Sequence, residues 1–411
     1  MTNMLSVDDA RQRVLEAVSP LAPVDVLVRD ALDLVLAEDL FAPHSLPRFD
    51  NSAMDGYAVI AADTVAGSQE APANLSLVGE VRAGDPGDVE VTTGSAARIM
   101  TGAPLPPGAD AVVPVELTEE RDDTVLIKEP AQPGRHVRPA GDDIERGQIL
   151  VQAGTELGPG ELALLASMGM SPLPVRRGPR VAVLVTGDEL VAPEAQPGPG
   201  QIRDSNSVAL AALVARAGGE VIPARPVADT HAATREAFER AADVSDLVLS
   251  SGGVAVGRYD FVKDVVSELG HIDMWRVAMQ PGKPVVLGSV VKTPFLGLPG
   301  NPVSIHVGFE QFVRPAIRKM RGCRSLLRAT ITATLADTIT KSPGRLHFVR
   351  VRLRSQGGNW VAVPTGPQGS HVQSSLIDCH GVARFPAEAT ELAAGTEVTV
   401  EVWDLPLGEN P

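Results

Sequence analysis

The chain has 411 residues, of which 36 are Lys or Arg and 51 are Asp or Glu, giving a formal net charge of -15 at pH 7. This length exceeds what one hydrophobic core usually organises, so two to four domains are expected. The acidic balance argues against an extended nucleic-acid surface, which would be basic, and no apolar stretch approaches the ~20 residues that a membrane span requires.

The first elements along the chain are predicted to be helical. Residues 6–18 predict a short helix with Ser6 as its N-cap and its apolar residues on one face. The start of the chain shows no apolar signal segment, which predicts a cytoplasmic protein. Residues 29–40 predict a second helix, and residues 158–169 predict a third that ends at Gly169.

A β-rich stretch lies between these helices, where short Val-rich runs from about 75 to 127 are separated by Gly, Pro and Asp. Ahead of it, the string DNSAMDGYA (50–58) combines carboxylate, amide and hydroxyl groups that favour a turn over a buried strand. Both a functional loop and a polar turn closing a hairpin are compatible with this string. The pattern predicts a discontinuous N-terminal domain, 1–46 and 142–178, interrupted by a β-rich domain, 47–141.

Strands then alternate with helices from 179 to 325. The predicted strands are VAVLV (181–185), EVIPARPV (220–227), DLVLS (246–250) and PVVLG (284–288), and the predicted helices cover 207–219, 231–242, 260–269 and 302–320. This spacing predicts a three-layer α/β domain with a mostly parallel sheet and helices on both faces. Period-two apolar runs from 326 to 411 predict a small C-terminal β-barrel.

Polar loops follow two of these strands, as TGDEL (186–190) and SSGGVAVG (250–257), and a third, LPGNPVS (298–304), follows a further predicted strand that begins at Phe295. In open α/β sheets, such loops share the edge at which ligands bind. Paired glycines let backbone N–H groups approach an anion. Asn301 followed by Pro302 predicts a helix N-terminus whose free N–H groups face the cleft.

Together with DNSAMDGYA (50–58), RIMTGAP (98–104), QPGKP (280–284) and QGSH (368–371), these loops resemble, in chain order, the signature strings of the molybdopterin molybdenumtransferases. That family includes the enzymatic domain of gephyrin, and the resemblance spans essentially the whole chain. It implies a transferase that inserts molybdate into adenylylated molybdopterin with Mg²⁺-dependent release of AMP, the final step of molybdenum cofactor biosynthesis.

Two alternative functions belong to other classes. One is a molybdopterin adenylyltransferase, although a lone adenylyltransferase lacks the DNSAMDGYA string and the flanking β modules. The other is a non-catalytic scaffold in the manner of gephyrin, which an extra linker or partner-binding extension would favour.

The implied substrates are anions, yet the candidate loops carry carboxylates. Carboxylates repel anions unless a cation lies between them, and hard oxygen ligands favour Mg²⁺. Asp229 and Asp260 are the predicted metal ligands, with Glu189 completing the site or orienting water; Asp229 could instead cap the following helix. The predicted catalytic residues are four acids of the candidate loops: Asp55, Asp143, Glu189 and Asp260.

Anion recognition is expected from backbone N–H groups, hydroxyls and mobile positive charges. The predicted substrate-binding residues are Thr101, Ser250, Ser251, Gly252, Gly253, Lys283, Pro299, Gly300, Asn301, Pro302, Arg345 and Ser370. Two of them have plainer alternatives, because Lys283 could be a solvated lysine and Thr101 a turn-stabilising residue. Arg276 and Gln280 stand where lysine is frequent in the family, and only Arg276 keeps the charge.

The resemblance also implies a homodimer with a shared active site. The DNSAMDGYA loop of one chain would face the α/β domain of the other. Other proteins of molybdenum cofactor biosynthesis are candidate partners, whereas nucleic acid and membrane are not expected.

Overall fold

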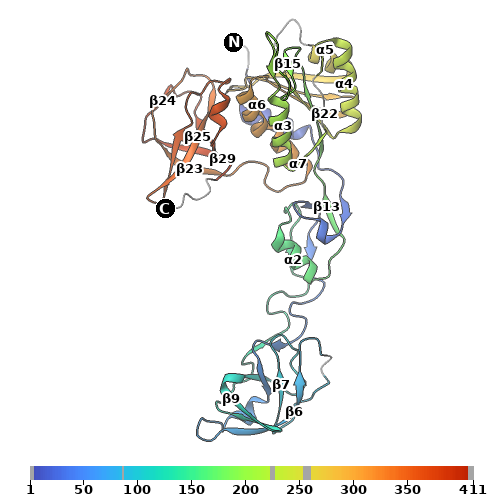
Figure 1. The fold of residues 1–411 in the computed structure, drawn as a ribbon, viewed down its shortest axis with the longest axis vertical. Helices are drawn as coiled ribbons and strands as arrows, with labels where there is room; N and C mark the ends of the chain where they lie inside the picture. The colour runs from blue at the N-terminus through green and yellow to red at the C-terminus, as the bar shows by residue number, and fades with distance from the viewer. Residues whose placement is uncertain (1–3, 86–87, 223–226, 253–260, 406–411) are drawn as a thin grey trace. The chain divides into compact units, whose positions relative to one another are not determined.

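The computed structural model describes residues 4–85, 88–222, 227–252 and 261–405, which form two compact units (Figure 1). The first unit comprises Met1–Glu38, Ala153–Gly158 and Pro172–Pro411, and the second comprises Asp39–Gln152 and Pro159–Ser171. Both units are therefore discontinuous in sequence. The finer division into four domains stays a prediction.

A six-stranded sheet forms the centre of the first unit. Its strand order is β17 (Glu220–Ile222), β14 (Arg180–Val185), β18 (Leu247–Ser251), β22 (Thr293–Leu298), β21 (Pro284–Val290) and β19 (Gly270–Arg276). The first four strands are parallel, whereas β21 and β19 run antiparallel to their neighbours. The prediction of a mostly parallel sheet is confirmed.

Alternate residues of the central strands face two separate hydrophobic cores. Val181, Val183 and Val185 of β14 belong to one core, while Ala182 and Leu184 belong to the other. The first core contains residues of α1 (Val7–Glu16), α3 (Asn206–Arg216), α6 (Pro302–Gly308) and α7 (Arg314–Met320), and the second contains residues of α4 (His231–Val244) and α5 (Phe261–Leu269). Two faces buried by helices produce the predicted three layers.

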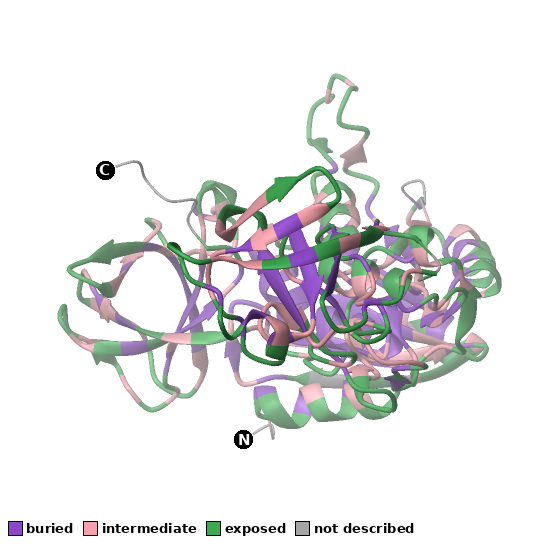
Figure 2. Ribbon diagram, turned by 90° about the horizontal axis from the view of Figure 1, so that it is seen from below, coloured by how far each residue is buried: buried purple, intermediate pink, exposed green. Residues whose placement is uncertain are grey.

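The predicted helix starts are confirmed at both ends of this unit. The hydroxyl of Ser6 accepts a hydrogen bond from the backbone N–H of Asp9 at 3.0 Å and so caps α1. Figure 2 shows buried positions of α1, beside the N-terminus, interspersed with exposed ones. The helix predicted over 302–320 is continuous, but its middle, Phe309–Val313, is π-helical. Asn301 occupies its N-cap position without a capping bond from its side chain.

The predicted helix over 29–40 is wrong. The segment forms a 3₁₀ turn, Val28–Asp30, and then β2 (Val35–Leu36) in a three-stranded antiparallel sheet with β13 (Leu173–Arg176) and β1 (Val24–Val26). Asp33 has a φ of 60°, which a right-handed helix does not tolerate. Pairing with β13 and full burial of Val35 and Leu36 therefore outweigh the local helix propensity.

The C-terminal residues of the first unit form a closed five-stranded barrel, as predicted. The strand order is β25 (Leu346–Gln356), β26 (Asn359–Pro364), β23 (Thr330–Leu335), β29 (Glu397–Val402) and β27 (Gly381–Phe385), and β27 also pairs with β25. A short two-stranded pair, β24 (Ile339–Thr340) and β28 (Glu391–Leu392), lies outside this ring. Strand β20 (Met279–Gln280) pairs in parallel with the start of β25, which joins the barrel to the α/β sheet.

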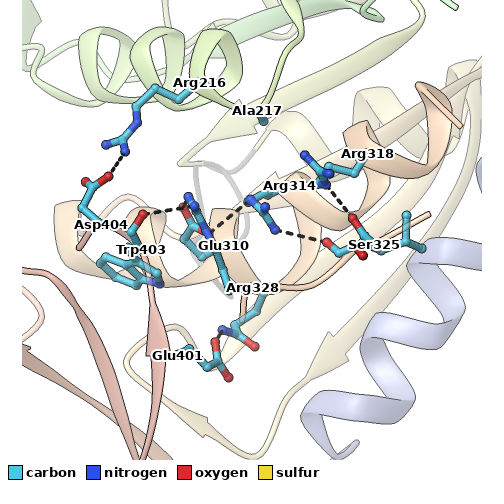
Figure 3. Close-up of polar contacts among 12 residues, drawn as sticks. Arg216, Ala217, Glu310, Arg314, Arg318, Ser325, Arg328, Glu401, Trp403 and Asp404 are labelled. Carbon is cyan, nitrogen blue, oxygen red and sulfur yellow. Dashed lines mark hydrogen bonds and ion pairs between the residues drawn. The ribbon is translucent and has the colours of Figure 1, made fainter. Parts of the chain in front are cut away.

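Buried polar contacts also join the barrel to the π-helical segment (Figure 3). Glu310 pairs with Arg328, and Gln311 donates to a carboxylate oxygen of Glu401 at 2.6 Å. The helix that begins at the carboxyl edge of the sheet therefore contacts the barrel and the chain entering it through its middle, π-helical part.

The second unit is built on another six-stranded sheet. Its order is β8 (Ala111–Pro114), β5 (Gly56–Val59), β7 (Ser95–Ile99), β6 (Ala73–Val81), β10 (Thr124–Ile127) and β9 (Thr118–Arg121). Two short pairs, β4 (Asn51–Ser52) with β11 (Val137–Arg138) and β3 (Leu40–Phe41) with β12 (Ile149–Val151), accompany helix α2 (Pro159–Ser167). The predicted β-rich stretch and third helix are confirmed. None of the helices in the described ranges is long and apolar enough to cross a membrane.

The string DNSAMDGYA is more regular than the sequence predicts. Asn51 and Ser52 are buried in β4, residues 56–59 are buried in β5, and only residues 53–55 form a loop. The hairpin alternative is wrong because β4 pairs with β11, whereas β5 pairs with β7 and β8. Glycine is required at position 56, since a Cβ there would lie 2.1 Å from the carbonyl oxygen of Val113.

Candidate active site

A cavity of about 810 Å³ lies at the carboxyl ends of the parallel strands in the first unit. Glu189 follows β14, Gly252 follows β18, and residues 299–302 follow β22, and all of them line the cavity. Because these strands are neighbours and run in one direction, their loops meet at the same edge of the sheet.

The opposite wall comes from the barrel and from the segment that leads to it. Residues 280–284, including Lys283, and the barrel residue Arg345 line the cavity. The parallel pairing of Gln280 with His347 brings these two segments together. Residues 368–370 complete the wall, and the carbonyl oxygen of Ser370 accepts a hydrogen bond from the N–H of Val303 at 3.2 Å.

The structure brings nine of the predicted site residues to this cavity: Glu189, Gly252, Lys283, Pro299, Gly300, Asn301, Pro302, Arg345 and Ser370. Ser250 and Ser251 do not line it, because both are buried within β18 at 0% and 1% exposure. Gly253 and Asp260 lie outside the described residues.

Asn206 is a cavity residue that the sequence reasoning missed. Its side-chain amide donates to the hydroxyl of Ser251 at 3.1 Å and to the carbonyl oxygen of Gly300 at 2.8 Å. It therefore ties the end of β18 to the loop after β22. A carboxylate oxygen of Asp204 accepts from the backbone N–H groups of Asn206 and Ser207 at 3.0 Å each. The sequence signal was the string DSNS ahead of an apolar helix.

Three acidic residues gather beside the cavity wall. Burial, and then the charges of Asp188 and Glu189, raise the pKa of Asp229. The N–H of Asp229 donates to a carboxylate oxygen of Asp188 at 3.0 Å. Asp229 does not cap α4, because the N-cap is Thr230, whose hydroxyl accepts from the N–H of Ala233 at 3.3 Å. Within the described ranges, no three His, Cys, Asp or Glu side chains converge closely enough to hold a metal ion.

The other predicted catalytic residues belong to the second unit. A carboxylate oxygen of Asp55 accepts a hydrogen bond from the backbone N–H of Thr101 at 2.7 Å. This bond and a further one from the Thr101 hydroxyl lower the pKa of the exposed Asp55 carboxyl. The N–H of Asp143 donates to the carbonyl oxygen of Leu46 at 3.0 Å. The strings DNSAMDGYA and RIMTGAP therefore form one local constellation.

The charges that line the cavity favour an anion. Arg203, Lys283 and Arg345 are positive, and Glu189 and Asp204 are negative. Asp204 is 4% exposed and already accepts two backbone N–H groups, so the basic side chains face mainly Glu189. A cavity of this kind, at the carboxyl edge of a three-layer α/β sheet and lined by glycines and basic side chains, is suited to an anionic ligand.

Family models match three consecutive parts of the chain. Residues 5–169 match the MoeA N-terminal region (domain I and II), residues 182–319 match a probable molybdopterin binding domain, and residues 332–403 match the MoeA C-terminal region (domain IV). The chain is 40% identical over 408 residues to "Molybdopterin molybdenumtransferase 2" of Mycobacterium tuberculosis, covering 98% of this chain and 100% of that protein. It is 36% identical over 409 residues to "Molybdopterin molybdenumtransferase" of Haemophilus influenzae, with the same coverage.

Solved structures agree with these matches. A crystal structure of the molybdopterin biosynthesis MoeA protein from Pyrococcus horikoshii has a TM-score of 0.85 and 34% identity, and the match covers 97% of this chain and 99% of that one. The chain therefore belongs to the molybdopterin molybdenumtransferases, which confirms the resemblance and the enzyme class expected from its strings.

Proposed function

We propose that the cavity at the edge of the α/β sheet binds adenylylated molybdopterin, and that the enzyme inserts molybdate with release of AMP as the final step of molybdenum cofactor biosynthesis. The relatives named molybdopterin molybdenumtransferase support this reaction. The observation that carries it is the convergence of three strand-end loops with Lys283 and Arg345 on one cavity. Such an arrangement would surround a single anionic ligand with N–H groups and two movable cations.

The glycine after β18 makes room for the ligand. Gly252 has a φ of 87°, a conformation that disfavours side chains. A Cβ at Gly300 would lie 3.8 Å from the Cα of Gly252, so the two glycine loops run close together. The N–H of Gly252 donates to the carbonyl oxygen of Leu298 at 3.1 Å, so the contribution of this glycine is to leave space for a phosphate between the loops rather than to bind it.

We assign a cation to the acidic side of the cavity, because Glu189 would otherwise repel the anionic ligand that Lys283 and Arg345 attract. Asp229 and Glu189 carry the hard oxygen ligands that Mg²⁺ prefers, and they lie close enough for the charge of Glu189 to raise the pKa of Asp229. Asp260, outside the described residues, would supply the third carboxylate. When bound, Mg²⁺ neutralises the charge that develops as the phosphoanhydride breaks.

The second unit would act on the α/β cavity of a partner subunit in a cytoplasmic homodimer. Asp55, held ionised by Thr101, and Asp143 are its proposed catalytic groups. Mixing Asp55→Ala chains with Asp260→Ala chains, each inactive alone, tests this arrangement. Recovered AMP release in the mixed dimers supports a shared site, and mixed dimers without activity contradict it.

The reaction itself is tested by incubating the purified protein with adenylylated molybdopterin and Mg²⁺, and following AMP with and without molybdate. We expect AMP release that molybdate stimulates and that chelation of Mg²⁺ abolishes. A folded sample that releases no AMP under any of these conditions contradicts the proposed function.

A further inference from the structure

The barrel contains an arginine that is fully buried and faces no acid. Arg350, in the middle of β25, is 0% exposed. None of the ion pairs among the described residues includes it. Burial lowers its pKa to about 10, so it still carries a positive charge at neutral pH. An unpaired buried charge is costly, and one that persists in a small barrel calls for a structural or functional reason.

Within the described part of the chain, the guanidinium of Arg350 donates hydrogen bonds only to residues 367–375, a segment whose first part lines the cavity. Nε donates to the hydroxyl of Ser375 at 2.8 Å, and one Nη donates to the carbonyl oxygens of Pro367 at 3.2 Å and Gly369 at 3.3 Å. The other Nη is buried without a partner among the described residues. The planar guanidinium fork therefore binds three hydrogen-bond acceptors within residues 367–375 at the same time.

The backbone of Arg350 also forms hydrogen bonds with this segment, through the side chain of Gln368. The side-chain oxygen of Gln368 accepts from the N–H of Arg350 at 2.9 Å, and its amide nitrogen donates to the carbonyl oxygens of Arg350 at 3.3 Å and Gly366 at 2.9 Å. Gln368, Gly369 and Ser370 in turn line the cavity.

The far end of this segment contacts the α/β sheet directly. The side-chain amide of Gln373 donates to the hydroxyl of Ser205 at 2.7 Å, and Ser205 lines the cavity. Together with the bond from Val303 to Ser370, this contact fixes the segment between the barrel and the cavity.

From these contacts we propose that Arg350 is a positioning residue, which holds residues 366–370 in the conformation that closes the substrate cavity. It touches no ligand itself and acts through Gln368, Gly369 and Ser370. The inference rests on the proposed function, because it assigns the segment to the site that binds adenylylated molybdopterin.

The test uses Arg350→Lys, which keeps the charge but loses the fork, and Arg350→Met, which loses both. Arg321→Lys is the matched control, because Arg321 is 3% exposed, also donates to a backbone carbonyl, that of Ala217, and does not line the cavity. Hydrogen exchange of peptides covering 366–373 is measured on the full chain without substrate, and AMP release is measured with adenylylated molybdopterin and molybdate.

We expect faster exchange of that segment in both Arg350 variants and kcat for AMP release lower on the order of 10- to 100-fold, with Arg350→Met the more affected. Arg321→Lys should change neither readout. Should either Arg350 variant fail to fold, Ser375→Ala removes one acceptor of the fork and should accelerate exchange of the same peptides.

Two outcomes separate the two proposals. Wild-type exchange and wild-type rates in folded Arg350 variants overturn the positioning role and leave the proposed function intact. The opposite case is faster exchange of the segment in the variants together with a wild-type protein that releases no AMP. That result overturns the proposed function and supports the positioning role of Arg350.

Discussion

Both carboxylate oxygens of Glu310 accept hydrogen bonds from Arg328 at 2.9 Å, and this pair joins the π-helical segment to the chain that enters the barrel. The side chain of Glu310 is 3% exposed, and Arg314 lies 3.8 Å from the same carboxylate (Figure 3). Burial lowers the pKa of Arg314 to about 10, which leaves it charged. Glu310 is therefore the anion that balances two arginines in a shielded place.

Replacing Glu310 with Gln should lower the free energy of unfolding by about 3–5 kcal/mol, because both arginines would lose their buried counterion. Urea denaturation followed by circular dichroism measures this. Glu236→Gln is the control, because Glu236 pairs with Arg240 on the exposed face of α4 and should change stability by less than about 0.5 kcal/mol. Equal effects of the two substitutions would contradict a buried ionic link.

Replacing Thr101 with Ala should raise the pKa of Asp55 towards its ordinary value, because the hydroxyl bond is lost while the backbone bond remains. Because the pKa of Asp55 is lowered in the folded state, these bonds stabilise the folded chain at pH values above the unfolded-state pKa. That stabilisation is lost as the pH falls through the folded-state pKa. Carbon NMR titration of the carboxyl groups measures the shift. Thr118→Ala, whose hydroxyl donates to Val115 within the same unit, should leave Asp55 unchanged.

Asn206→Ala should lower the rate of AMP release by about tenfold, because its side chain would no longer connect the end of β18 to the loop after β22. The loss of two neutral hydrogen bonds should also cost about 1–3 kcal/mol of stability. Steady-state kinetics on folded protein, beside a Ser207→Ala control from the same turn of α3, measures the first effect. Unaltered kinetics in Asn206→Ala would contradict this role, because the two loops would then keep their positions without the Asn206 side chain.

Asp229→Asn should stabilise the Mg²⁺-free protein slightly and remove most of its stabilisation by Mg²⁺. The pKa of Asp229 is raised, so its charge costs stability as the pH rises from the unfolded-state to the folded-state pKa. A bound cation reverses that cost, because a ligand that binds only the folded state raises Tm. Thermal melts at neutral pH with and without Mg²⁺ measure both effects.

The control for this prediction is Asp243→Asn, an exposed acid at the other end of α4. It should leave the Mg²⁺ dependence of Tm as it is in the wild type. A wild-type Tm that does not respond to Mg²⁺ would count against a metal role for Asp229.

The α/β part of the fold was readable from the sequence because its signals are local. An apolar run such as residues 181–185 is long enough to be a buried strand, and glycines such as Gly218, with a φ of 82°, end a helix where the pattern predicts it. Because these strands run parallel, the loops that follow them must lie at the same edge of the sheet. The sequence therefore predicts that Glu189 and residues 299–302 lie at one site, and both line the cavity.

The failures come from contacts that distant segments make. Residues 35 and 36 become a strand only because β13, more than 130 residues later, pairs with them. Likewise, Ser250 and Ser251 look like loop residues beside two glycines, but pairing with β14 and β22 draws them into the sheet. Arg350 carries no local signal at all, since the hydrogen bonds of its guanidinium reach residues 17 or more positions away.

The central claim is that the cavity bounded by Gly252, Lys283 and Arg345 is where the substrate binds. The most direct test is a crystal structure of the protein soaked with AMP, Mg²⁺ and molybdate. The account predicts the AMP phosphate in this cavity, with the metal ion bound to the Glu189 and Asp229 carboxylates. Nucleotide bound elsewhere on the molecule, with those acids free of metal and this cavity empty, would contradict it.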